Sequence, residues 1–598
     1  MAAGDRWERA RAPVVLVGFM AAGKTTAGRI LASLTGREFL DLDDLIALGS
    51  GRPVPDIIRT SGEARFRGLE ARALAAACRT SGTVIATGGG AVMAAANRRT
   101  LARAGCRVVW LKVSPAEVLR RAGRTSDRSD APTPGHGAGR PLLPPTVEEV
   151  GRLLAAREEG YRDAATLEVS TEGRSAEAVA RELAVLLELP GGRSAVAPGH
   201  GTEFARVDGG PPDHGPVVVG RGLLGGLASL PGFPGDGLTR VFLAGDPLAL
   251  ALYGGRVVRS LRQAGMEVDV EALPPGEGAK RAGVLARLWE SMALRGLGRG
   301  DLVLSLGGGA ASDLAGFAAA TYMRGVPVAH VPTTLLAQVD AAVGGKTAIN
   351  LSRGKNLAGV YHFPSLVAAD LDTLGTLPPD LVAEGTVELA KTLLVGGTSV
   401  REARALALTA HRVLLAGDAP AAGHPSGVPG DDPVAAAVGK AVAAKLGTVA
   451  EDPRDRGRRM ALNLGHTFGH ALEAASRFRG RHGLSVAVGM LAAARLSEGR
   501  GCLAGEALQA VVSLAEDLIG LFPARDLGRL GRLEAREVQS WMAADKKRAG
   551  RDLVFVLLRG TGDGMVEPFT AKGVTGAEAA GALGLTLARV RHLKEGRE

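Results

Sequence analysis

The sequence predicts an α/β protein built from two modules, and three observations lead to this prediction. Short apolar runs alternate with helical stretches in the first module, residues 1–190, and again in residues 216–375. The segment between them, residues 191–215, is rich in Gly and Pro and is typical of a linker. Residues 376–598 are rich in Ala and Leu. We therefore expect a parallel-sheet domain, a linker, a second α/β half and a mainly helical half.

The composition indicates a soluble globular protein with several cores. At 598 residues, 46% hydrophobic and 22% charged, the chain is too long for one core and too apolar for disorder. The sequence contains no run of 18 apolar residues, so it predicts no membrane span. The three cysteines, Cys78, Cys106 and Cys502, form no metal-spaced pair, and the N-terminus does not resemble a secretory signal, so we expect a cytoplasmic protein.

The net charge of +10 could indicate a nucleic-acid-binding protein. However, the arginines are dispersed, and four Trp, four Tyr and 13 Phe offer few rings for stacking on bases. The charge therefore favours small anionic substrates. A steep salt dependence of DNA affinity would identify the alternative, a nucleic-acid binder.

The first element with a chemical signature is GFMAAGKTT, residues 18–26, which fits the pattern G-x-x-x-x-G-K-[ST]. It follows the expected strand Val14–Val17 and precedes the expected helix Ala27–Leu34. In this context backbone N–H groups face a phosphate, Lys24 reaches the β- and γ-phosphates, and the Thr25 hydroxyl holds Mg²⁺. The pattern thus predicts a nucleotide phosphate site.

Four further clusters follow in this module. Asp41 and Asp43 stand at the end of an expected strand, and Arg67 lies on an expected helix. The strand Thr83–Ala86 leads into Gly88-Gly89-Gly90, where a ligand approaches the main chain closely. Two cations, Arg140 and Arg157, follow a Pro/Gly-rich insertion, residues 124–139, which we expect to form a loop.

This ordered set resembles the shikimate kinase family over residues 13–190. The resemblance implies that Asp43 orients the shikimate hydroxyls and assists the attacking one, that Arg67 and Arg157 clamp the carboxylate, and that Gly89 donates an amide. Arg140 would stabilise the transferred phosphoryl group from a lid. Gluconate and nucleoside kinases are the competing interpretations. The implied ATP and Mg²⁺ residues are Gly18, Gly23, Lys24, Thr25, Thr26, Asp41 and Arg140, and the implied catalytic residues are Lys24, Asp43 and Arg140.

The second module begins with a nucleotide-binding pattern. Glu277 and Lys280 precede the expected strand Leu302–Leu306, which runs into Gly307-Gly308-Gly309 with Asp313 beyond it. This strand, glycine turn and helix form a nucleotide-binding arrangement, although not the usual G-x-G-x-x-G fingerprint. A dense set of cations and amides also indicates a substrate that bears carboxylate and phosphate groups: Arg324, Lys346, Lys355, Asn356, Lys391, Lys445 and Arg459.

Three histidines indicate a metal. His466 and His470 stand at i and i+4, so they share a helix face, and His482 lies 16 residues beyond His466. Two imidazoles and one carboxylate form a common catalytic zinc set with an open position for substrate. The spacing alone does not show which two of the three histidines bind the metal, nor which carboxylate joins them.

The strings PTTLLAQVDAAVGGKTAIN (332–350) and LNLGHTFGH (462–470) closely resemble the 3-dehydroquinate synthase family, and the likeness extends over almost the whole module. The resemblance implies NAD, and Zn²⁺ or Co²⁺ held by Glu388, His466 and His482. It also implies a homodimer formed through this module. The implied NAD residues are Glu277, Lys280, Gly308, Gly309, Asp313, Thr333, Thr334, Lys346, Lys355, Thr373 and Thr376. The implied substrate residues are Arg324, Asp340, Lys346, Asn356, Lys391, Lys445, Arg459, Asn463, His470 and Lys546, with Lys391 and His470 also catalytic.

The implied reaction explains this inventory. NAD⁺ oxidises a ring hydroxyl that the metal polarises, phosphate then leaves, and the hydride returns before ring opening and aldol closure. Substrate phosphate oxygens can serve as the base. Three features depart from the family: Ser312 before Asp313, Leu484 after the last histidine motif, and the insertion at residues 417–432. Another sugar-phosphate cyclase and a glycerol-dehydrogenase-like enzyme remain alternatives.

The sequence as a whole therefore predicts a bifunctional enzyme of the shikimate pathway. The two reactions are not successive in that pathway, so the fusion does not imply direct transfer of an intermediate. The alternative is that one module has become a regulatory or binding module while the other catalyses.

Overall fold

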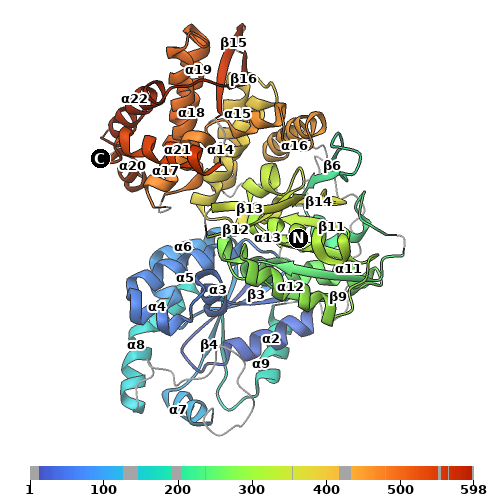
Figure 1. Ribbon diagram of the computed structural model, residues 1–598. Helices are drawn as coiled ribbons and strands as arrows, with labels where there is room; N and C mark the ends of the chain where they lie inside the picture. Colours follow the sequence, from blue (N-terminus) through green and yellow to red (C-terminus); the bar gives the residue numbers. More distant parts are fainter. Residues whose placement is uncertain are drawn as a thin grey trace. The chain divides into compact units, whose positions relative to one another are not determined.

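The computed structural model describes residues 12–124, 146–187, 189, 204–235, 237–352, 354–416, 432–477, 480–549, 554–562 and 565–595; residues 123, 124 and 543–549 are described by their backbone alone. The chain divides into two compact units (Figure 1). The first comprises residues 1–199 with 247–255, and the second comprises residues 200–246 with 256–598.

The first unit is built on a five-stranded parallel sheet in the order β2-β3-β1-β4-β5. Its central strand β1 is buried on both faces, which is why it is a continuous apolar run, VVLV. The strands are β1 (Val14–Val17), β2 (Glu38–Asp41), β3 (Thr83–Ala86), β4 (Arg107–Lys112) and β5 (Leu167–Ser170).

Helices connect these parallel strands. The helices are α2 (Lys24–Thr35), α3 (Leu42–Ser50), α4 (Val54–Ser61), α5 (Glu63–Cys78), α6 (Ala95–Arg103), α7 (Pro115–Arg124), α8 (Val147–Ala164) and α9 (Ala176–Leu186). Of these, α2, α7, α8 and α9 contribute apolar residues to a core with the sheet, whereas α3, α4 and α5 form a smaller apolar cluster around Ile46, Ile57 and Phe66. The carboxyl ends of β1, β2 and β3 lie at the same edge of the sheet, and the segments of the predicted kinase motifs leave the sheet there.

The second unit contains a seven-stranded sheet in the order β6-β7-β14-β11-β10-β8-β9, parallel except for β6. The chain runs from β8 outward to β9 and returns to β10 on the other side of β8. Ligands of open α/β sheets bind at such a change of direction, beyond the carboxyl ends of the strands. The strands are β6 (Phe204–Val207), β7 (Val217–Gly220), β8 (Arg240–Gly245), β9 (Glu267–Ala272), β10 (Leu302–Gly307), β11 (Val328–Pro332) and β14 (Leu366–Asp370).

The connections of this half include helices and one hairpin. The helices are α11 (Gly255–Gln263), α12 (Ala282–Leu294) and α13 (Gly309–Thr321), and the antiparallel hairpin consists of β12 (Lys346–Leu351) and β13 (Gly354–Tyr361). The short helix α10 (Pro247–Ala249) follows β8 in the chain but is grouped with the first unit. The strand β6 lies within the segment that the sequence suggests as a linker. It pairs with β7, so the last part of that segment belongs to the second sheet.

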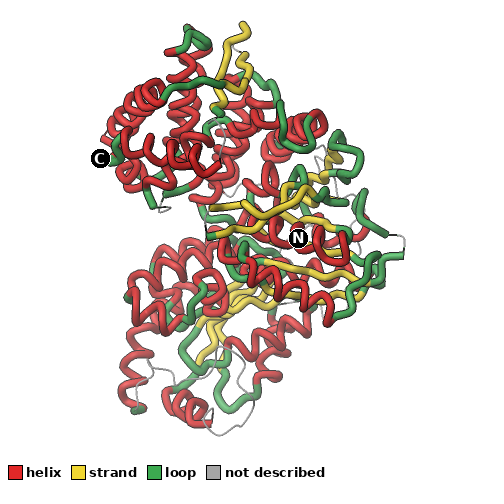
Figure 2. Tube along the Cα trace, in the orientation of Figure 1, coloured by secondary structure: helices red, strands yellow, loops and turns green. Residues whose placement is uncertain are grey.

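The rest of the second unit is mainly helical, as Figure 2 shows. Its helices are α14 (Pro379–Val395), α15 (Val400–Ala416), α16 (Pro433–Glu451), α17 (His466–Ala475), α18 (His482–Gly499), α19 (Gly505–Gly520), α20 (Ala524–Gly531), α21 (Ala535–Ala549) and α22 (Gly576–Glu595). One antiparallel hairpin, β15 (Phe555–Gly562) with β16 (Met565–Ala571), interrupts them.

These helices share one apolar core. Of the described helices, α16 alone meets the length and hydropathy expected of a membrane span, and half of that stretch is buried inside the protein. Its apolar residues, such as Val438 and Val442, belong to the shared core.

Candidate active sites

The phosphate loop of the first unit has a shape that only glycine permits at two positions. Gly18 has φ 143°, and a Cβ there would stand 2.6 Å from the carbonyl oxygen of Leu111. Gly23, with φ 90°, begins α2 from a left-handed conformation. Lys24 Nζ donates to the carbonyl oxygens of Gly18 and Phe19, both at 2.8 Å. The ammonium therefore lies across the loop in which a phosphate would sit.

Two oxygen groups meet beside this loop. The Thr25 hydroxyl donates to Asp41 Oδ2 at 2.8 Å, while Asp41 Oδ1 accepts from the Asp43 backbone N–H and so caps α3. Hydroxyl and carboxylate oxygens are the ligands that Mg²⁺ prefers, directly or through water. Thr26, the next residue, is exposed.

Asp43 lies among other carboxylates at the same edge. Loss of hydration, and then the negative charges of Asp41 and Glu70, raise the pKa of Asp43 to about 6. A carboxylate with such a pKa is ionised at neutral pH and is a better proton acceptor than an ordinary aspartate.

Arg67 is held by two glutamates of its own helix, α5. It donates to Glu70 Oε2 at 2.7 Å and to Glu63 Oε1 at 2.9 Å. Glu70 is buried, whereas the Glu63 side chain is mostly exposed. A Cβ on Gly90 would stand 2.8 Å from an Arg67 nitrogen, so the bare backbone of Gly90 leaves room for the guanidinium.

Helix α8 brings a second cation to the glycine turn. Arg157 Nη1 donates weakly to the Gly89 carbonyl at 3.4 Å and lies over the Phe19 ring, while the Tyr161 hydroxyl donates to the same carbonyl at 2.5 Å. Sequence reasoning did not find Tyr161, because a lone tyrosine on a helix has no distinctive pattern. Arg140 lies outside the described residues.

In the second unit, three of the expected NAD residues, Glu277, Lys280 and Asp313, belong to one polar network with Asn356, which was expected to bind substrate. Lys280 Nζ donates to Asp313 Oδ2 at 2.5 Å and to the Asn356 side chain, and Asn350 donates to Glu277 at 2.6 Å. The Asn356 backbone N–H in turn donates to the Asn350 side chain at 2.9 Å. Asn350 is a member of the network that sequence reasoning did not single out.

The glycine turn after β10 is closely packed. A Cβ on Gly309 would stand 2.8 Å from the Ala341 Cβ, and one on Gly308 would stand 3.2 Å from the Thr334 side chain. Thr333 is buried at the end of β11. Two other expected NAD residues, Thr373 and Thr376, lie in the turn η7 (Leu371–Thr376). The Thr373 hydroxyl donates to the Asp370 carbonyl oxygen at 2.7 Å, and the Thr376 hydroxyl donates to the Thr373 carbonyl oxygen at 3.1 Å.

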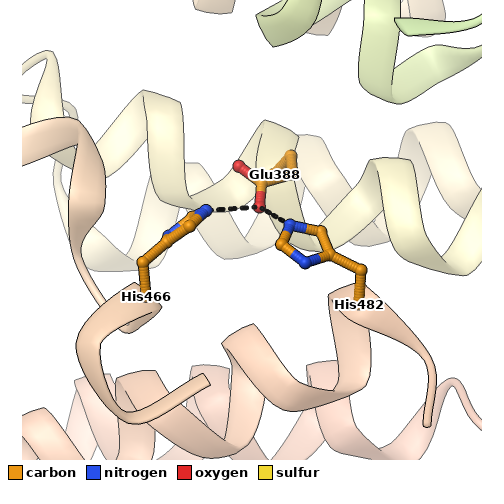
Figure 3. A group of neighbouring side chains, drawn as sticks. All are labelled: Glu388, His466 and His482. Atoms are coloured by element: carbon orange, nitrogen blue, oxygen red, sulfur yellow. Dashed lines mark ion pairs between the residues drawn. The ribbon is translucent and has the colours of Figure 1, made fainter. Parts of the chain in front are cut away.

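Three metal-ligating side chains converge in the helical half. One ligand atom each from Glu388, His466 and His482 can be chosen so that all three lie within 4.8 Å of one another. His466 Nε2 is 3.6 Å and His482 Nε2 is 3.5 Å from Glu388 Oε1. Figure 3 shows the two imidazoles pointing at the carboxylate from α17 and α18, while Glu388 comes from α14.

The surroundings of this cluster suit a cation. Glu388 is 1% exposed, and its Oε1 has no hydrogen-bond partner in the part of the chain that the structure describes. A buried carboxylate oxygen that faces two ring nitrogens at this distance is well placed for a divalent metal. Lys391, one turn along α14, forms an ion pair with Glu388 Oε2 at 2.6 Å and is also buried.

Each histidine of the cluster has a partner on its other nitrogen. His482 Nδ1 lies 2.8 Å from Glu473 Oε1, and His466 Nδ1 lies 3.3 Å from the Leu464 carbonyl oxygen. His470 is exposed, and its ring lies edge-on to His466 with centroids 5.4 Å apart. Glu473 was missed by sequence reasoning, although it stands seven residues after His466 and so shares its face of α17.

Several of the expected anion-binding residues lie close together. Lys445 forms an ion pair with Asp340, which lies in the π-helical turn η6 (Ala337–Ala341). Burial lowers the pKa of Lys445 to about 8, and the Asp340 carboxylate opposes this effect. Arg459 is buried and donates to the Gly344 carbonyl at 2.7 Å.

The remaining expected residues are more peripheral. Lys346 forms an ion pair with Asp455 at 2.6 Å, a partner that sequence reasoning had not identified. Arg324 and Lys355 are exposed, and Asn463 is partly buried in the turn η8 (Arg458–Asn463). The side chain of Lys546 and residues 417–431 of the insertion at 417–432 lie outside the described parts of the chain.

Comparison with known proteins assigns both units. Residues 20–188 match the shikimate kinase family, and residues 270–384 and 427–548 match the N-terminal and C-terminal parts of 3-dehydroquinate synthase. A 3-dehydroquinate synthase of Caulobacter vibrioides is 41% identical over 353 residues, which are 58% of this chain and 91% of that protein. The enzyme of Rhodococcus opacus is 40% identical over 362 residues, 60% of this chain and 89% of its own.

A solved structure agrees for the second unit. The 2-epi-5-epi-valiolone synthase of Streptomyces hygroscopicus subsp. jinggangensis, with NAD⁺ and Zn²⁺ bound, is 25% identical with a TM-score of 0.51. The match covers 62% of this chain and 96% of that one. This chain therefore belongs to the 3-dehydroquinate synthase family and carries a shikimate kinase domain ahead of the synthase, so it is a bifunctional enzyme of the shikimate pathway.

Proposed function

We propose that the first unit, residues 1–190, transfers the γ-phosphoryl group of ATP to the 3-hydroxyl of shikimate. Lys24 and the loop amides hold the phosphates, and Thr25 and Asp41 hold Mg²⁺. Asp43, with its raised pKa, accepts the proton of the attacking hydroxyl. Two cations, Arg67 and Arg157, bind the carboxylate beside Gly89.

Arg140 completes this proposal. By its place in the sequence motif it supplies positive charge to the transferred phosphoryl group. The pair of carboxylate-binding arginines favours shikimate over a nucleoside, which has no carboxylate for them to bind. Gluconate does carry a carboxylate, and the match of residues 20–188 to the shikimate kinase family is what favours shikimate over it.

For the second unit, residues 216–598, we propose the conversion of 3-deoxy-D-arabino-heptulosonate 7-phosphate into 3-dehydroquinate with release of phosphate. NAD and a divalent metal, Zn²⁺ or Co²⁺, would supply reversible oxidation of the substrate and polarisation of its hydroxyl. The network of Glu277, Lys280 and Asp313 at the carboxyl end of the sheet would bind NAD. The glycine turn beside it would let the dinucleotide approach the backbone.

The remaining residues would hold the substrate and move protons. Glu388, His466 and His482 would bind the metal, and Lys391 on the same helix would place a substrate oxygen beside it. Lys445 and Arg459, both buried, would bind the carboxylate or phosphate in a dry environment, where charge pairs are strong. Asp340 contacts the substrate hydroxyls, and His470 relays a proton near the metal.

The observation on which the synthase proposal rests is the convergence of Glu388, His466 and His482 beside the buried ammonium of Lys391. A second candidate is another sugar-phosphate cyclase, which the likeness to the valiolone synthase favours. The 41% identity to a 3-dehydroquinate synthase and the buried cations argue for the carboxylate-bearing substrate.

We further propose a cytoplasmic enzyme whose partners are ATP and small anionic metabolites, with no role for nucleic acid or a membrane. The synthase unit would form a homodimer. In support of this, the β12–β13 hairpin carries exposed apolar side chains, among them Leu357 at 60% and Tyr361 at 39%.

Two assays on the purified full-length protein test this proposal. The first follows ATP-dependent phosphorylation of shikimate, and the second follows phosphate release from the heptulosonate phosphate in the presence of NAD⁺, with the product identified by mass and NMR. We expect Lys24→Ala to abolish only the first activity and His466→Ala only the second. If either variant silenced both activities, the assignment of one site to each unit would be wrong.

A further inference from the structure

The contact between Glu473 and His482 extends the metal site beyond its three expected ligands. Glu473 lies on α17 and is 6% exposed, and its Oε1 is 2.8 Å from His482 Nδ1. A carboxylate only accepts hydrogen bonds at neutral pH, so the ring nitrogen must be the donor. Once a metal ion binds at the cluster, Nε2 must give up any proton it carries, so the metal-bound His482 keeps its proton on Nδ1 and offers the Nε2 lone pair.

That lone pair faces the cluster. His482 Nε2 lies 3.5 Å from Glu388 Oε1, on the opposite side of the ring from Glu473. The imidazole thus lies between two carboxylates. Of these, only Glu388 belongs to the candidate metal-binding group of Glu388, His466 and His482. Glu473 therefore orients a ligand without being one.

His466 has a weaker support of the same kind. Its Nδ1 is 3.3 Å from a neutral carbonyl oxygen, that of Leu464. The hydrogen bond to a buried carboxylate is shorter and stronger than one to a carbonyl. The two histidines are therefore not equivalent, and His482 is the one whose basicity a negative charge increases.

Charge balance gives Glu473 a second effect. The charged groups at the cluster include the buried Glu388, Glu473 and Lys391, and Asp340 also acts on the Lys391 ammonium. A divalent cation bound there would stand close to Lys391, which repels it, and two carboxylates offset that repulsion better than one. Loss of Glu473 would remove one of the two buried carboxylates that contact His482 and would weaken this balance.

The position of Glu473 also ties together the two helices that supply the histidines. It lies near the end of α17, while His482 is the first residue of α18. The hydrogen bond crosses the short connection between these helices and fixes the direction of the first side chain of α18. A rigid second helix then presents its ligand in one orientation.

We infer that Glu473 is a positioning residue that raises the metal affinity of the synthase unit by orienting His482 and adding a buried negative charge beside the metal. This inference rests on the proposed metal-dependent function of that unit. Removal of such an outer carboxylate typically costs metalloproteins about 10- to 100-fold in metal affinity.

The test is a titration of the metal-stripped full-length protein with Zn²⁺ and Co²⁺ in competition with a chelator, for the natural chain and the variants Glu473→Ala and Glu473→Gln. We expect the alanine variant to bind Zn²⁺ about 10- to 100-fold more weakly, because both the hydrogen bond and the charge are lost. The glutamine variant keeps an acceptor oxygen, so it should lie between the natural chain and the alanine variant. The Co²⁺ absorption bands should shift in the alanine variant, since the ring is no longer held.

Two controls keep the result interpretable. Glu498→Gln alters a partly exposed glutamate of α18 that pairs with Arg495, and it should leave the metal affinity unchanged. NAD affinity, measured without metal, reports whether each variant is folded. If the alanine variant fails to fold, the glutamine variant decides the question.

Metal affinity equal to that of the natural chain in a folded Glu473 variant would overturn the inference. A natural chain that binds no metal would overturn both the inference and the proposed function. A natural chain that binds metal, shows the Glu473 effect and yet makes no 3-dehydroquinate would support the inference and remove only the proposed substrate.

Discussion

The Thr25 hydroxyl donates to the Asp41 carboxylate over 2.8 Å, which joins the phosphate loop to the end of strand β2. The contact has a direct consequence for the magnesium ion of the kinase. Both groups carry oxygen donors, and the carboxylate supplies the negative charge. Thr25 follows the loop lysine, so this pair lies where the β- and γ-phosphates are expected.

We predict that Asp41→Asn raises the Mg²⁺ concentration needed for half-maximal kinase activity by about tenfold, since one anionic oxygen is lost while asparagine still caps α3. The measurement is the rate of shikimate phosphorylation at fixed ATP over a Mg²⁺ series. The matched control is Asp44→Asn, which alters an exposed carboxylate 3.9 Å from Arg29 and should leave the Mg²⁺ requirement unchanged. An unchanged Mg²⁺ requirement in Asp41→Asn would place the ion elsewhere.

Kinase activity should fall at acidic pH because of Asp43. Its pKa is raised to about 6, first by loss of hydration and then by Asp41 and Glu70. The ionised form is the proton acceptor, so kcat/KM for shikimate should decrease about tenfold per pH unit below pH 6 and reach a plateau above it. The pH profile of the synthase activity of the same protein serves as the reference.

The same shift predicts the sign of a stability effect. A carboxyl group whose folded pKa lies above its unfolded value destabilises the fold as pH rises through the interval from about 4 to about 6. Asp43→Asn should therefore raise the Tm of the first unit at pH 7 and lose this advantage at pH 4, measured by calorimetry. A Tm gain of equal size at both pH values would contradict the raised pKa.

The two glutamates that hold Arg67 should differ in importance. Glu70 is buried and fixes the guanidinium from within the protein, whereas the more exposed Glu63 forms a contact that water weakens. We predict that Glu70→Gln raises KM for shikimate about tenfold with little effect on KM for ATP, because the carboxylate clamp loses its orientation. Glu63→Gln is the matched control, with a change below about twofold. Equal effects of the two variants would show that burial of the pair does not matter.

Much of this molecule could be predicted from the sequence, because its strongest signals are local. The strand Val14–Val17 and the turns after β3 and β10 are formed as expected, since buried parallel strands have continuous apolar sequences and glycines mark the turns. The convergence of Glu388, His466 and His482 also agrees with the residues chosen from the family motif.

The residues that were missed have a different character. Tyr161, Asn350 and Glu473 act through contacts with segments distant in sequence or across a helix connection. The spacing of residues in the sequence does not predict that a single tyrosine or asparagine contacts a distant loop. The Glu473 position could have been found, because its spacing from His466 places both on one helix face.

His214 holds the loop that precedes Lys346 through a hydrogen bond to Gly344. Its Nδ1 lies 2.6 Å from the Gly215 carbonyl oxygen, so that nitrogen carries the proton, and Nε2 accepts from the Gly344 N–H at 3.2 Å. Arg459 donates to the carbonyl of the same Gly344 at 2.7 Å. Gly344 has φ 99°, a conformation that needs glycine, and is thus fixed from both sides.

We predict that His214→Ala costs about 1 kcal/mol of unfolding free energy at pH 7, because the Gly344 N–H loses its acceptor. Burial lowers the pKa of His214 below its usual 6.5, and the hydrogen bond to Gly215, the next largest effect, opposes this only in part. The neutral ring is therefore favoured in the fold. The stabilisation is then complete above pH 6.5 and decreases as the pH falls through the folded pKa. Urea unfolding of the natural chain and the variant at pH 7.5 and pH 5 should show the difference shrink at the lower pH. A difference that stays constant or grows on acidification would mean that His214 does not hold Gly344 as a neutral acceptor.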